Sequence, residues 1–78
     1  MKPISELTRK YTVQGSWRPT KTLEALDATD AVDRYIVTFN GTSDTFANDI
    51  GRSFLFTVLV VATQEHIEIR RNILQKPL

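Results

Sequence analysis

The apolar run FLFTVLVVA, residues 54–62, constrains the fold of this chain more than any other feature. It is far shorter than the ~20 residues that a helix needs to cross a membrane. Its branched and aromatic side chains occupy both alternate sets of positions, which is typical of a central strand covered on both faces. A single helix covers only one face of a sheet, so the other face needs a different cover. In a strand, one set of side chains is Phe54, Phe56, Val58, Val60 and Ala62, and the other set is Leu55, Thr57, Leu59 and Val61.

The N-terminal third of the chain predicts a β-hairpin. Residues 10–17, KYTVQGSW, alternate with the period of two that is typical of a half-buried strand. This alternation points Tyr11 and Trp17 inward, and we expect both rings in the core of so small a domain. Pro19 favours a turn, and residues 20–26, TKTLEAL, alternate again. The two runs therefore pair as neighbouring strands.

Two interpretations compete for residues 27–41, DATDAVDRYIVTFNG. As a helix, the segment has Asp27 as its N-cap and glycine in the left-handed position after its end. As a strand, YIVTF would enter a type I′ turn at NG, but the TSDTF that follows is too polar for a good second strand. We predict a helix over residues 28–39, with an apolar stripe at helical spacing. The stripe consists of Ala28, Val32, Tyr35, Ile36 and Phe39, of which Val32, Ile36 and Phe39 are expected to be buried.

The remaining segments complete the predicted order. Residues 42–51, TSDTFANDIG, indicate a short helical turn that ends at glycine. Residues 65–71, EHIEIRR, alternate and favour a strand hairpinned to the run at 54–62. A helix over residues 64–74 also fits the spacing of the isoleucines, so both assignments stay open there.

These elements predict one α+β domain over residues 1–78. The order is β-β-α-(short α)-β-β, with a small antiparallel sheet and one main helix packed on one of its faces. A hydrophobic content of 41% and a charged content of 24% are ordinary for a globular domain. The chain has no cysteine, so disulfides cannot supplement its core.

The residue inventory argues against an enzyme. His66 is the only histidine, and an alternating stretch with glutamates on both sides predicts that it is a surface residue of a strand. Neither a nucleophile elbow, a zinc-protease motif nor a phosphate-binding glycine loop occurs. We expect no catalytic residue, no cofactor and no metal site.

Charge is distributed unevenly along the chain, although the net charge is only +1. Residues 1–22 are basic, and Lys10, Arg18 and Lys21 lie on or beside the predicted hairpin. They are candidate contacts for nucleic acid, because single-strand binders combine a basic groove with aromatic platforms. A pI of about 8.1 is modest for such a protein, and the nearby aromatic rings are expected inward.

The acidic middle segment suggests a third function, an inhibitor whose carboxylates imitate the phosphates of nucleic acid. The acids in question are Asp27, Asp30, Asp33, Asp44 and Asp49. Helix capping and the helix dipole already account for the first three.

Protein–protein interaction is the function that the sequence favours. We expect an oligomer or a small component of a larger assembly, with Leu55, Thr57, Leu59 and Val61 as the candidate interface. Nucleic-acid binding is the alternative, and no membrane partner is expected. Because residues 1–10 lack the apolar core of a signal peptide, we expect the cytoplasm, or assembly inside a host cell. The short, cysteine-free chain has the general character of small virus-encoded proteins.

Overall fold

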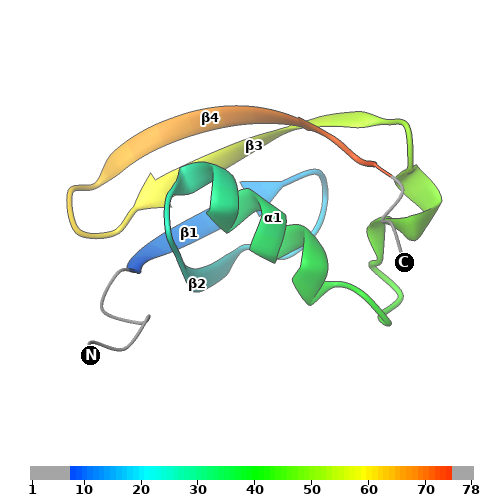
Figure 1. The fold of residues 1–78 in the computed structure, drawn as a ribbon, viewed down its shortest axis with the longest axis horizontal. Coiled ribbons are helices and arrows are strands. Elements are labelled where there is room, and N and C mark those ends of the chain that lie inside the picture. The colour runs from blue at the N-terminus through cyan, green and yellow to red at the C-terminus, as the bar shows by residue number, and fades with distance from the viewer. Residues whose placement is uncertain (1–7, 75–78) are drawn as a thin grey trace.

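The computed structural model describes residues 8–74 (Figure 1). Its elements are the strands β1 (Arg9–Gly15) and β2 (Lys21–Ala25), the helix α1 (Ala28–Thr38), the short 3-10 helix η2 (Phe46–Asp49), and the strands β3 (Ser53–Val60) and β4 (Glu65–Asn72). This order confirms the predicted α+β fold with one main helix.

The four strands form one antiparallel sheet in the order β2-β1-β3-β4. The two central strands are β1 and β3, and the two edges are β2 and β4. Helix α1 packs on one face of this sheet and contacts all four strands (Figure 1). The predicted hairpin of the first two strands is confirmed. Residues 65–72 form a strand paired with β3, so the helical alternative for residues 64–74 is wrong.

The core lies between the sheet and α1. Tyr35 of α1 is fully buried, and its ring packs edge-on against Phe39 at 4.9 Å and against Phe56 at 5.9 Å between ring centroids. The other buried apolar residues come from every element except β4, after which Ile73 directly follows: Tyr11, Val13, Ala25, Ala31, Val32, Phe46, Val58, Val60 and Ile73.

Helix α1 begins where the sequence predicts and ends one residue earlier, with Phe39 as its C-cap. Asp27 is its N-cap, and the backbone N–H of Asp30 donates to the Asp27 carboxylate at 2.8 Å. Gly41 follows the helix with a φ of 78°, the left-handed conformation that glycine adopts without strain. Val32 and Phe39 are buried as predicted, whereas Ile36 is only partly buried because it borders a surface groove.

Trp17 is not in the core, so the prediction that its ring points inward is wrong. Strand β1 ends at Gly15, and Ser16 has a φ of 53°, which breaks the alternation of the strand. The next side chain therefore turns outward, and Trp17 is 71% exposed. Tyr11, which lies within the strand, is buried as expected.

Candidate protein-binding surfaces

The face of the sheet opposite α1, here called the open face, carries the four predicted interface residues. Phe56, Val58 and Val60 of β3 are buried beneath α1. The alternate positions of the same stretch therefore turn to the open face. Leu55 is 45% exposed there, and Thr57, Leu59 and Val61 are partly exposed, Val61 lying just beyond the end of β3. No element among residues 8–74 packs on this face.

Polar and charged residues flank this row on both neighbouring strands. Leu59 lies between Thr12 of β1 and His66 of β4. Thr57 lies between Gln14 and Glu68, and Leu55 lies opposite Arg70. An apolar centre with a polar rim is the usual composition of a protein–protein interface.

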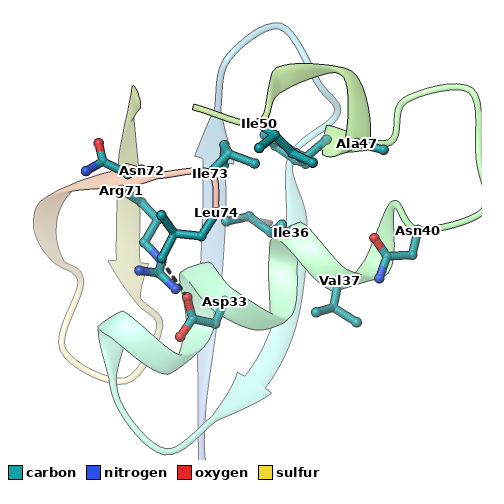
Figure 2. A pocket seen from close by; sticks show the side chains of 11 residues that line it. Asp33, Ile36, Val37, Asn40, Ala47, Ile50, Arg71, Asn72, Ile73 and Leu74 are labelled. Atoms are coloured by element: carbon teal, nitrogen blue, oxygen red, sulfur yellow. Dashed lines mark hydrogen bonds and ion pairs between the residues drawn. The ribbon is translucent and has the colours of Figure 1, made fainter. Parts of the chain in front are cut away.

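A groove opens on the other side of the molecule, between α1, η2 and the end of β4 (Figure 2). Its volume is about 400 Å³. Three apolar residues on its lining are exposed, namely Val37 at 50%, Ile50 at 49% and Leu74 at 66%. At one end of the groove, the Arg71 guanidinium donates to the Asp33 carboxylate at 2.8 Å, as the dashed line in Figure 2 marks.

Sequence reasoning missed this groove for a simple reason. Its walls come from three segments that are distant along the chain, and none of them has an unusual pattern by itself. The one signal in the sequence is Val37, an apolar residue beside Ile36 on α1. The groove lies along the side of α1 that carries these two residues.

Arg18, a candidate nucleic-acid contact, is buried and fully engaged within the protein. Only 4% of its surface is exposed. Its guanidinium donates to the carbonyl oxygens of Asp44 and Thr45, to Ser16 Oγ at 3.0 Å, and to the Asp49 carboxylate at 2.9 Å. It also lies 3.5 Å from the centroid of the Phe46 ring. Arg18 as placed here is not accessible to a phosphate.

The other two candidate nucleic-acid contacts, Lys10 and Lys21, lie on opposite faces of the sheet. Lys10 is exposed and alternates with the buried Tyr11, so it lies on the open face. Lys21 pairs in register with the buried Val13, which places it on the face that α1 covers, and its Nζ lies 4.3 Å from the Phe39 ring centroid. The predicted basic hairpin therefore does not present its three cations together.

The acidic residues of the middle segment are largely engaged in local structure. Asp27 caps α1, Asp33 pairs with Arg71, and Asp49 contacts both Arg18 and Arg52. The pKa of Asp30 is lowered, chiefly because the Leu26 backbone N–H donates to its carboxylate and secondly because Arg34 lies beside it. Of the five acids, only Asp44 has no hydrogen-bond or ion-pair partner for its carboxylate within residues 8–74. A single carboxylate does not imitate a phosphate backbone.

His66 is exposed on the open face, where its cross-strand neighbour is Leu59. Within residues 8–74, no group of three or more histidine, cysteine or acidic residues could hold a metal ion. No helix in that part of the chain is long and apolar enough to cross a membrane.

Comparisons with protein-family models, with curated proteins and with solved structures found no match.

Proposed function

We propose that this protein is a non-catalytic protein-interaction module, acting as an oligomer or as a small component of a larger assembly. The observation that carries the proposal is the open face. A central strand of the sheet exposes Leu55 and partly exposes Leu59 and Val61 on it, and no part of residues 8–74 covers them. Burial of such side chains contributes about 25 cal/mol for each Å² removed from water, which favours contact with another protein.

Nucleic-acid binding is the weaker proposal. Its three cations do not share a surface, and β1, β3 and β4 carry no phenylalanine, tyrosine or tryptophan on the open face on which a base could stack. We place the protein in the cytoplasm of the cell that makes it. A phage or other mobile-element origin rests only on the small size and composition of the chain.

Two aspartate substitutions on opposite faces of β3 test the proposal. Leu55→Asp changes an exposed residue of the open face and should leave the fold intact while abolishing assembly through that face. Val60→Asp should unfold the chain, because it buries a charge beneath α1 without a partner. Circular dichroism reports folding, and light scattering coupled to size-exclusion chromatography reports the mass of the assembly.

Thr29→Asp is the matched control, because it adds the same charge at an exposed position in the first turn of α1. It should change neither folding nor assembly. A Leu55→Asp variant that stays folded and assembles like the wild type would remove the open face as the interface.

A further inference from the structure

Strand β4 has one unpaired edge. Within residues 8–74 it hydrogen-bonds only to β3, and Figure 1 shows no described element along its other side. The strand is 8 residues long and contains no proline. A long edge of this kind presents a row of free backbone donors and acceptors to a further strand.

The hydrogen bonds at the end of β4 show which backbone groups are free. The N–H of Ile73 donates to the Arg52 carbonyl at 2.8 Å, and the Ile73 carbonyl accepts from Gly51 at 2.7 Å. Ile73 thus turns both of its groups toward the β3 side. Since the direction alternates along an antiparallel strand, the groups that face the free edge belong to His66, Glu68, Arg70 and Asn72.

The side chains along this edge carry an unused charge pattern. Glu68 and Arg70 are exposed and carry opposite charges, and neither makes an ion pair within residues 8–74. Ile69 lies between them on the other face and is only partly buried, since it packs at the margin of the core. The edge therefore offers both charges and apolar surface to a partner strand.

One antiparallel register between two copies of β4 matches these features. Centred on Ile69, it places Glu68 opposite the partner's Arg70, and Arg70 opposite the partner's Glu68. The two Ile69 side chains then meet at the two-fold axis. Opposite charges in directly facing positions stabilise a strand pair, and like charges destabilise it.

The neighbouring registers lack this complementarity. Centring on Glu68 places that carboxylate opposite itself and His66 opposite the partner's Arg70. Centring on Arg70 places two guanidinium groups opposite each other. Centring on Ile67 leaves Arg70 without an acid across from it.

We propose that β4 pairs with β4 of a second copy of this chain, antiparallel and centred on Ile69. The pairing joins two four-stranded sheets into one continuous sheet. Both α1 helices then lie on the same side, and the two open faces become a single larger surface. This contact uses the edge of the sheet and does not rest on the proposed role of the open face, so the two can fail separately.

Disulfide trapping tests the register directly, because the chain has no cysteine of its own. In Ile69→Cys, the two new thiols face each other in a non-hydrogen-bonded pair with Cα atoms about 4.5 Å apart, within the range that a disulfide spans. Ile67→Cys is the matched control on the same face of β4. Its two thiols would sit roughly 13 Å apart, four residues along the strand.

We expect mild oxidation to convert Ile69→Cys, but not Ile67→Cys, into a covalent dimer on a non-reducing gel. Failure of Ile69→Cys to cross-link, or equal cross-linking of Ile67→Cys, would overturn the proposal. Leu55→Asp should not prevent the cross-link, which separates this contact from the open face.

A charge-swap series measured by sedimentation equilibrium supplies the second test. Glu68→Arg and Arg70→Glu each create two facing pairs of like charge and should weaken dimerisation roughly tenfold. The double variant restores both opposite-charge pairs and should recover the wild-type constant. Single variants without effect, or a double variant as weak as the singles, would contradict the pairing.

Discussion

At the scale of a single residue, Arg18 joins two segments that are distant along the chain. Its guanidinium joins the loop after β1 to residues 44–49 through two carbonyls and one carboxylate. It also lies close to two rings, with its centre 4.7 Å from the Trp17 ring centroid and closer still to Phe46. A planar fork of donors is what this arrangement requires.

Replacement of Arg18 by lysine should therefore be costly even though the charge is kept. A lysine ammonium cannot donate to several acceptors in one plane. Buried carbonyl oxygens that lose their donor lower the stability of the folded protein. We expect a loss of about 2–4 kcal/mol in the free energy of unfolding, measured by urea denaturation. Arg9→Lys, at an exposed position of β1, is the control and should change it little. An unchanged midpoint for Arg18→Lys would show that the network contributes nothing.

Tyr35 predicts a sensitivity to alkaline pH. Burial raises the pKa of its phenol above 10.0, and its hydroxyl donates to the Pro19 carbonyl at 2.8 Å. The folded state thus holds the proton more tightly than the unfolded chain, so this contribution is complete below pH 10 and is lost as the pH rises further. Tyr35→Phe should be less stable by about 1 kcal/mol at pH 8 and should lose less stability between pH 9 and 11. Parallel slopes for the two proteins across that range would contradict this origin.

At the scale of the elements, Gly15 fixes how closely β1 approaches the core. It pairs with Phe56 in register, and a Cβ added to Gly15 would lie 2.0 Å from a carbon of that ring. Gly15→Ala should therefore cost about 1–3 kcal/mol by overpacking. Gly41→Ala is a useful comparison, since its added Cβ meets nothing within 4 Å and any loss there comes from its left-handed backbone alone. A Gly15→Ala protein as stable as the wild type would show that Phe56 moves aside freely.

The elements themselves were accessible from local patterns. Asp27 and the glycine after α1 are local signals at its two ends, and the apolar stripe recurs at helical spacing along it. Alternation predicts β1 and β2, and the apolar run predicts β3, whereas the isoleucines of β4 also fit a helical spacing. The exposure of Trp17 could not be predicted from the sequence, because it depends on the left-handed backbone of Ser16. Serine is not a residue type that favours this conformation.

At the scale of the whole molecule, the sequence predicts one candidate surface and misses another. The open face follows from strand periodicity and the presence of a single main helix. The groove and the burial of Arg18 depend on segments that meet only in the folded chain, residues 18 and 49 among them. Contacts of this kind leave no local pattern.

The mass of the wild-type protein in solution tests the central claim most directly. Light scattering over a range of protein concentrations, with and without a single-stranded oligonucleotide, distinguishes protein assembly from nucleic-acid binding. We predict a mass that rises with concentration to a multiple of the 8.9 kDa chain and does not change when the oligonucleotide is added. A chain that remains at 8.9 kDa throughout and binds the oligonucleotide with a steep dependence on salt would contradict the account.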